Sequence, residues 1–253
     1  MCEYDKLEGI KYTIVKTKAR TFKQLLAAEK KGTITAKVVE KARIWLQEGQ
    51  TDYHWWDSIY EFWNAALAQL GFEGSEINFS DLGEQGGGAG FTSSTLDFKK
   101  LIPYLSGTVS LADCVTVDAE GKEDYRGYVA KLIHLPELEE ARYAELLLVE
   151  SQLSGEVQRL RSNYYHSKTT EAVIDFEPED QDDNEYAVNV PALLEVDKVL
   201  DDFRRDVDAL RGRICDKIYE QLQAECEYLV SDESLIETSE ANDYRFDERG
   251  GII

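Results

Sequence analysis

The sequence predicts an α+β fold, an antiparallel sheet of about four or five strands packed with helices. One observation is the stretch 191–229, where apolar residues recur every three or four positions and acidic residues fill the opposite side. A second is a set of short β-branched or alternating segments at 9–16, 76–82, 90–97, 164–176 and 244–246. We expect residues 1–176 to form the core and residues 177–253, an acidic loop and C-terminal helices, to pack on it in one compact domain.

Two short helices are expected after the first strand. Thr21 can cap one that continues to Glu29 and ends at Gly32, since threonine caps helices and glycine ends them. Thr33 or Thr35 can cap the second, which continues to Glu48. Lysines on this segment form a basic patch, which we interpret as a solvated helical surface.

The stretch 51–70 is the aromatic centre of the sequence and is predicted to be a helix ending at Gly71. Its large side chains leave little polar surface. We interpret it as a mostly buried core helix, with a partner-binding anchor as the alternative, because tryptophan and tyrosine dominate interface hot spots. The residues concerned are Tyr53, Trp55, Trp56, Ile59, Tyr60, Phe62, Trp63, Ala66, Leu67 and Leu70.

A glycine-rich segment separates the strands 76–82 and 90–97, whose short separation predicts a hairpin. No Gly-Lys-Ser/Thr follows the glycines, so the segment is not a phosphate loop, and the dinucleotide fingerprint is not matched either. We expect a turn or bulge that requires positive φ. The glycines are Gly83, Gly86, Gly87, Gly88 and Gly90.

The second half of the chain is predicted to be mostly helical. Helices are expected at 98–105 and 136–161, the second with a break near Ser154-Gly155 as an alternative. The strand 164–176 and an exposed acidic loop at 177–185 follow. The long acidic amphipathic helix occupies 191–229. Ser231 can cap a final helix that ends near Asn242.

The net charge of −22 restricts the partners, and residues 175–253 carry −16 of it. Such a surface repels nucleic acid and anionic membranes and attracts basic proteins, although negative charge also serves solubility. No apolar run approaches the roughly 20 residues of a membrane span. Four scattered cysteines without a Cys-x-x-Cys pair argue against disulfides or zinc, so we expect a reducing cytoplasm.

Carboxylates one helical turn apart are spaced by roughly 5–6 Å, comparable to phosphates along a nucleic-acid strand. The acidic loop and helix therefore predict a partner-binding surface that mimics DNA. Arg205 follows Asp201 by four residues and Arg211 follows Asp208 by three, which predicts partial neutralisation within the helix. The candidate residues are Asp180, Asp182, Asp183, Glu185, Asp197, Asp201, Asp202 and Asp208.

Catalytic and metal sites have weaker support. His54, His134 and His166 lack metal-ligand spacing, and the acidic loop lacks the glycine and flanking helices of an EF-hand. His166, beside Ser167 and Lys168, is a weak candidate for a general base. The sequence predicts no metal and no cofactor.

Three segments resemble a family of uncharacterised phage and mobile-element proteins often labelled antitoxin-like. They are the aromatic helix with Phe79-Ser-Asp-Leu-Gly-Glu-Gln-Gly-Gly-Gly-Ala-Gly-Phe91, the segment 162–167, and residues 218–233 with the continuation 240–244. In the family the glycine segment looks like Ser-Gly-Phe-Trp-Ser-Gln-Gly-Asp-Gly-Ala, from which Leu82, Glu84 and Gly87 depart. The resemblance implies a phage or mobile-element origin and no known reaction.

Three functions follow as hypotheses. The first is a non-enzymatic inhibitor, of the anti-CRISPR or antirestriction type, that binds the nucleic-acid-binding face of a nuclease or effector in the host cytoplasm. The second is an antitoxin that neutralises one cognate toxin. The third is an enzyme with a site formed by His166 and the Gly83–Gly90 segment.

Overall fold

The structure, a computed structural model, describes residues 18–82, 87–107, 114–135, 142–160, 163–177 and 190–253. The chain divides into two compact units. The terminal unit comprises residues 1–54 and 227–253, and the central unit comprises residues 55–226. The predicted boundary after residue 176 borders the undescribed stretch 178–189 and stays a prediction.

The terminal unit contains the helices α1 (Phe22–Lys30), α2 (Ala36–Thr51) and α7 (Asp232–Ala241). The predicted cap of α1 is confirmed, because the Thr21 hydroxyl accepts a hydrogen bond from the backbone N–H of Gln24, whose side chain accepts one from the Thr21 N–H. Ser231 caps α7 through the Ser234 N–H, also as predicted. Thr35 precedes α2 but forms no such side-chain bond.

The core of the terminal unit is built from all three helices and the C-terminal segment. Phe246 is fully buried there and forms isolated β-bridges with Arg20 and Ile252, so the predicted strand 244–246 is limited to single bridges. The predicted strand 9–16 lies outside the described residues. The core residues are Phe22, Leu25, Val39, Ala42, Leu46, Leu235 and Phe246.

The central unit begins with α3 (Asp57–Leu70), which starts later than predicted because α2 extends to Thr51. Gly71 ends α3 in the left-handed conformation with φ of 101°, as the sequence predicted. The helix α4 (Phe98–Leu105) has the predicted bounds and is capped by the Asp97 side chain. The buried side chains of α3 are Trp63, Ala66, Leu67 and Leu70.

The described strands form four separate two-stranded antiparallel sheets, so the predicted single sheet of four or five strands is wrong. Four of the strands are only two residues long. The glycine-rich β3 packs against the turn around His166 instead of a third strand, and a single bridge from Ser93 to Val157 connects it towards β7. The pairs are β1 (Phe72–Glu73) with β4 (Thr95–Leu96), β2 (Glu76–Ser80) with β3 (Gly88–Thr92), β5 (Thr116–Val117) with β6 (Glu123–Asp124), and β7 (Leu153–Arg159) with β8 (Thr170–Phe176).

The helix predicted for 136–161 is also wrong over the described residues. Residues 142–160 form two short 3₁₀ helices, η1 (Ala144–Leu148) and η2 (Glu150–Gln152), followed by β7, whereas 136–141 lies outside the described residues. Leu153 and Val157 are buried and are four residues apart, a spacing that fits a strand as well as a helix. Within the strand Gly155 has no room for a side chain, since a Cβ there would lie 2.7 Å from the Val173 carbonyl oxygen on β8.

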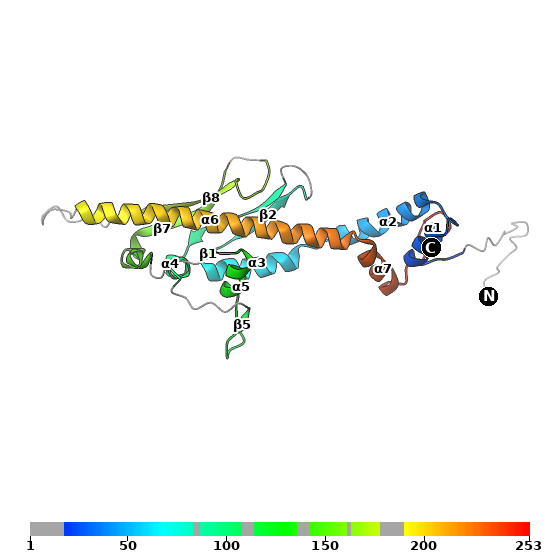
Figure 1. Ribbon diagram of the computed structural model, residues 1–253, viewed down its shortest axis with the longest axis horizontal. Helices are drawn as coiled ribbons and strands as arrows, with labels where there is room; N and C mark the ends of the chain where they lie inside the picture. Colours follow the sequence, from blue (N-terminus) through cyan, green and yellow to red (C-terminus); the bar gives the residue numbers. More distant parts are fainter. Residues whose placement is uncertain (1–17, 83–86, 108–113, 136–141, 161–162, 178–189) are drawn as a thin grey trace, which may run out of the picture. The chain divides into compact units, whose positions relative to one another are not determined.

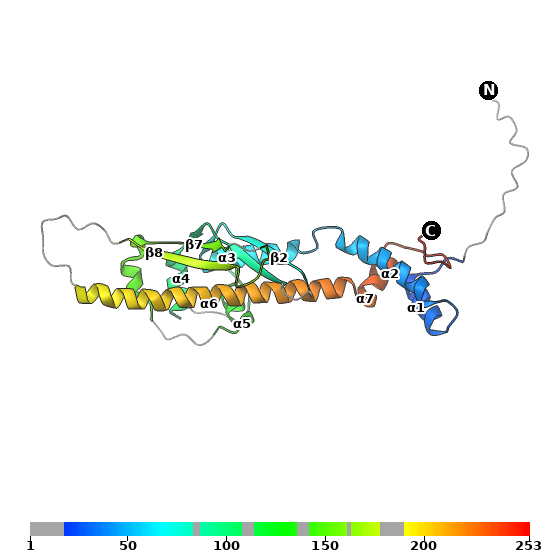
Figure 2. The ribbon, with the colours of Figure 1, turned by 90° about the horizontal axis from the view of Figure 1, so that it is seen from above.

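The helices α5 (Arg126–Leu132) and α6 (Val190–Leu229) complete the structure. The sequence left α5 unassigned, but the long α6 is confirmed, and its apolar stripe is buried. Figures 1 and 2 show β7 and β8 running beside the central-unit part of α6. Within the described residues, no helix combines the length and apolarity needed to cross a membrane. The buried stripe includes Leu200, Phe203, Val207, Leu210, Ile214, Ile218 and Leu222.

Candidate functional site

The predicted partner-binding acids fall into two groups. Asp180, Asp182, Asp183 and Glu185 lie in the segment 178–189, outside the described residues. Asp197, Asp201, Asp202 and Asp208 all lie on α6 and can be placed. In sequence the first group connects the end of β8 with the beginning of α6.

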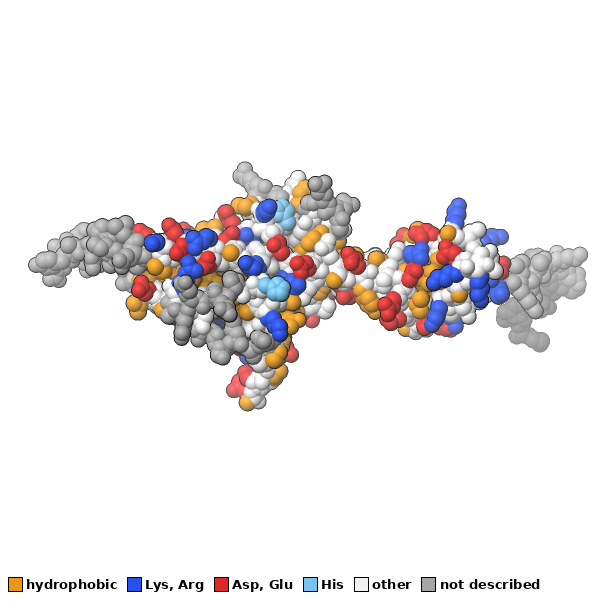
Figure 3. Space-filling model, viewed as in Figure 1, with side chains coloured by type: hydrophobic (Ala, Val, Ile, Leu, Met, Phe, Trp, Pro, Cys, Tyr) orange, Lys and Arg blue, Asp and Glu red, His pale blue; other side chains and the backbone are white. Residues whose placement is uncertain are grey.

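Ion pairs neutralise more of α6 than the sequence predicted. Asp208 pairs with Arg211 at 2.7 Å, as expected, but Arg205 contacts Asp202 at 2.9 Å instead of Asp201. Asp201 pairs with Arg204 at 3.0 Å. Figure 3 accordingly shows Lys and Arg side chains interspersed with Asp and Glu along this face. The spacing of four residues favoured the wrong partner, since the pairs on α6 around Asp201, Asp202 and Asp208 all join residues three apart.

A further arginine, which the sequence pattern did not indicate, also pairs with acids of α6. Arg142, just before η1, contacts Asp202 at 3.4 Å and Asp206 at 3.1 Å. Its guanidinium also lies over the Tyr143 ring, 5.2 Å from the centroid. A residue sixty positions away therefore offsets two of the carboxylates on α6, and Asp202 is a poor candidate for a free docking group.

Asp175, Asp197 and Asp201 are all exposed, and we call the three together the acidic edge. The Asp201 side chain is 75% exposed, and Asp197 is exposed with no ion pair within the part of the chain that the structure describes. Arg204 links Asp201 to β8, because its Nε donates a hydrogen bond of 2.9 Å to the Ile174 carbonyl next to Asp175. The edge therefore lies where β8 approaches α6.

Asp208 has a structural role instead. Its carboxylate accepts hydrogen bonds from Arg211 Nε and from the Ala172 backbone N–H at 3.3 Å. Arg211 is only 4% exposed and donates from Nη1 to the Ser167 carbonyl and the Thr170 hydroxyl, each at 2.7 Å. The pair holds the turn before β8 against α6.

The structure brings His166 and the glycine segment together, as the enzyme hypothesis requires. Gly87, Gly88 and His166 line a cavity of about 300 Å³ with Lys168 and Asp216. A Cβ on Gly88 would lie 2.2 Å from the His166 Cβ. Gly87, Gly88 and Gly90 do not have positive φ, so the predicted strained turn is wrong for these three, whereas Gly83 and Gly86 lie outside the described residues. Close approach of the His166 turn is what excludes a side chain at Gly88.

The hydrogen bonds of His166 favour a structural part as well. Its Nδ1 accepts a hydrogen bond of 3.0 Å from the Lys168 backbone N–H, and the His166 backbone N–H donates to the Thr169 hydroxyl at 3.0 Å. A neutral imidazole whose Nδ1 is an acceptor carries its proton on Nε2. In this tautomer Nε2 is a donor, whereas a general base needs an acceptor nitrogen. Catalysis at His166 stays a prediction.

The core interpretation of the aromatic stretch is confirmed for one face of α3, whereas the partner-binding alternative stays a prediction for the other. Trp63 is fully buried and donates from Nε1 to the Gln221 side chain at 2.7 Å. Phe62 is half-buried and lines a cavity of about 700 Å³ together with Tyr125 and Tyr128. The sequence missed this cavity because α5 was unassigned, although two tyrosines three residues apart were the available signal.

No group of three or more His, Cys, Asp or Glu side chains that could hold a metal ion occurs among the residues that the structure describes.

Residues 55–232 match the model of a family described as "Domain of unknown function (DUF8835)". The match begins where the central unit begins and extends six residues past its end. No curated protein and no solved structure matches the chain.

Proposed function

The chain belongs to this domain family of unknown function, and from its own surface we propose that it is a non-enzymatic, phage- or mobile-element-encoded inhibitor of a host defence system. It binds, in the host cytoplasm, the nucleic-acid-binding face of a nuclease or effector of the CRISPR or restriction type. The proposal rests on the acidic edge, where Asp175, Asp197 and Asp201 stand exposed at the junction of β8 and α6. A nucleic-acid-binding face is basic and therefore complementary to this edge.

The geometry supports docking in two ways. Asp197 and Asp201 are one turn apart on a 40-residue helix, which fixes their spacing at little entropic cost. Arg204 holds Asp201 against β8 while leaving its side chain 75% exposed. The ion pairs at Asp202, Asp206 and Asp208 offset the negative charge next to this edge and make the mimicry of DNA local instead of continuous along α6.

The test is displacement of DNA from a defence nuclease. Purified restriction endonucleases and CRISPR effectors are loaded with fluorescent duplex DNA, and the protein is titrated in while anisotropy is recorded. We expect displacement of DNA from at least one of them. The effect should weaken at high salt, because exposed charges are screened beyond about 10 Å at 0.1 M ionic strength.

Two double variants test which acids are responsible for displacement. Asp197→Lys with Asp201→Lys should lose displacement, and Asp182→Lys with Asp183→Lys tests the acidic loop in the same assay. The control is Glu48→Lys with Glu248→Lys, an equal charge change at exposed positions of the terminal unit. If the α6 and loop variants both displaced DNA like the parent protein at both salt concentrations, the proposal would be wrong.

A further inference from the structure

The cavity beside Phe62 has walls of aromatic rings. The Phe62 ring, from α3, meets Tyr125 at a centroid distance of 5.3 Å and Tyr128 at 5.9 Å, with interplanar angles of 89° and 83°. Tyr125 and Tyr128 are half-buried, so part of each ring remains open to solvent. Aromatic faces carry negative potential and attract cations that lie within about 6 Å of the centroid.

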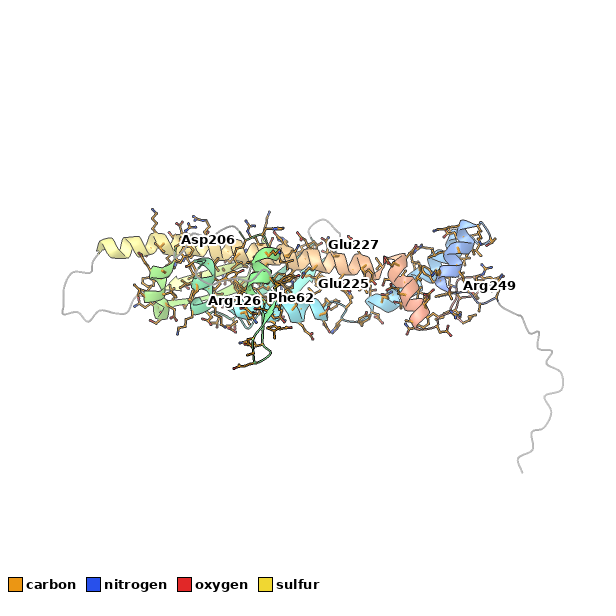
Figure 4. All side chains as sticks on the ribbon, turned by 60° about the horizontal axis from the view of Figure 1, so that its bottom comes forward. Phe62, Arg126, Asp206, Glu225, Glu227 and Arg249 are labelled. Carbon is orange, nitrogen blue, oxygen red and sulfur yellow. The ribbon has the colours of Figure 1, made fainter. Side chains whose placement is uncertain are left out.

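The charges of this cavity are all negative. Glu123 and Glu225 line it, and none of its described lining residues is Lys, Arg or His. Tyr125 donates its hydroxyl to Glu123. Glu225 is half-buried and makes no ion pair within the described residues. Figure 4 shows Phe62 and Glu225 near one another, on α3 and α6.

A neighbouring cavity of the same volume shows that this charge arrangement is particular. That cavity is lined by Lys100, Lys122 and Arg126 as well as by acids. Arg126 is held there by Asp124, its Nη2 lying 2.7 Å from the carboxylate. Glu123 lines both cavities. Lysines and an arginine offset the acids of the neighbouring cavity, whereas no described cation lines the Phe62 cavity.

The walls are fixed before any ligand arrives. The Gln69 side chain accepts a hydrogen bond of 2.8 Å from the Tyr125 N–H and donates one of 2.6 Å to the Glu123 carbonyl, which positions the segment before α5. On the other side, the bond from Trp63 to Gln221 ties α3 to α6. A preorganised site loses less free energy to ordering when it binds.

We propose that the Phe62 cavity binds the guanidinium group of an arginine side chain from a partner protein. A guanidinium can stack on an aromatic face while its N–H fork donates to a carboxylate, and here Tyr125 or Tyr128 supplies the face and Glu225 the carboxylate. Arginine is enriched at the centres of interfaces and on nucleic-acid-binding faces. The identification of the source as a partner protein rests on the proposed function, whereas the recognition of the cation rests on the cavity alone.

The test needs no nuclease. The 253-residue chain is titrated with the blocked tripeptide acetyl-Gly-Arg-Gly-amide and followed by two-dimensional NMR. We expect shifts around Phe62, Tyr125 and Tyr128 and a dissociation constant on the order of 1 mM. The matched peptide with citrulline, which has the same shape and no charge, should not bind. The lysine peptide should bind about threefold more weakly, because an ammonium group does not stack or donate as a fork.

Variants separate the cavity from general attraction to an acidic protein. Glu225→Gln should weaken binding about 3- to 10-fold, and Phe62→Leu should weaken it as much. Glu220→Gln, the same charge change on the same helix outside the cavity, should leave it unchanged. Equal effects of the two glutamine variants, equal binding of citrulline, or tighter binding of lysine would each overturn the proposal. Failure here with successful DNA displacement removes only the arginine site, and the reverse result removes only the nuclease target.

Discussion

Arg211 and Arg205 lie on the same helix and each pairs with the aspartate three residues earlier, but their surroundings differ. The Arg211 side chain is 5% exposed and that of Arg205 is 64% exposed. Arg211 holds the turn around Ser167 and Thr170, whereas Arg205 contacts only Asp202 and Asp206 among the described acids. The same spacing of three residues between aspartate and arginine therefore gives a structural bond in one place and a solvated pair in the other.

Removing the Arg211 guanidinium should produce the largest difference between the two sites. Arg211→Met keeps much of the apolar stem but leaves the Ser167 carbonyl and the Thr170 hydroxyl without their donor. We expect the free energy of unfolding to fall by about 3 kcal/mol, since unsatisfied buried groups and broken buried ion pairs are costly. Urea denaturation measures it.

Arg205→Met is the matched control, and the comparison fails if the two substitutions cost the same. Arg211→Lys sharpens the test, because it retains the charge but not the fork of donors. It should recover only part of the loss. Full recovery would mean that charge alone matters at this position.

Gly88 tests the other side of the same turn. Gly88→Ala places a Cβ 2.2 Å from the His166 Cβ and 2.7 Å from its Cα, so β3 and the turn must separate. Overpacking of this kind costs about 1–3 kcal/mol. Gly90→Ala is the control on the same strand, where the nearest atoms lie at 3.4 Å. Thermal unfolding compares the stability of the two variants. Equal losses of stability would contradict the role of close approach at Gly88.

These two sites show where sequence reasoning succeeded and where it could not. Local signals located α1, α4, α6 and α7, since caps and apolar period depend on neighbouring residues. Helix and strand were confused at 153–159, where Leu153 and Val157 fit both periods. The single sheet was wrong because pairing between distant strands leaves little local trace.

The candidate sites divide in the same way. The pair of Asp208 with Arg211 was predictable from spacing, but its burial depends on Ser167 and Thr170, about forty positions earlier. Arg142 beside Asp202 and the tyrosines beside Phe62 also come from distant segments. Sequence reasoning could therefore find charged and aromatic residues without deciding which were free to bind.

Cys215 lies one helical turn after Arg211 on α6, and its buried thiol makes the stability of this site depend on pH. Burial raises the pKa of its thiol to about 11, although the Arg211 charge acts in the opposite direction. Between its ordinary pKa of about 9 and this value, the unfolded chain loses a proton that the folded chain keeps. Its contribution to stability is thus fully present below about pH 9 and lost as the pH rises to about 11. We expect a loss of about 1 kcal/mol at pH 10.

The measurement is the change in unfolding free energy between pH 8 and pH 10 in the parent protein and in Cys215→Ala. The variant should show a smaller decrease, because it lacks the Cys215 thiol. Buried tyrosines such as Tyr143, whose pKa is also raised by burial, contribute equally to both proteins, so the difference between the two reports on Cys215. Exposed Cys114 serves as an internal control for thiol labelling, which should be rapid there and slow at Cys215. Identical pH profiles would show that the Cys215 thiol does not stay protonated.

Arg205 should give the smallest effect. Arg205→Ala is expected to change the free energy of unfolding by at most about 0.5 kcal/mol, because exposed pairs gain little and are screened by salt. Asp202 and Asp206 keep Arg142 as a partner after the substitution, at 3.4 and 3.1 Å. Arg142→Ala with Arg205→Ala leaves both carboxylates without an arginine, so the double variant should lose more than the sum of the single ones. A loss for Arg205→Ala alone that approaches that of Arg211→Met, or one that persists at high salt, would mean that exposure is not what separates the two arginines.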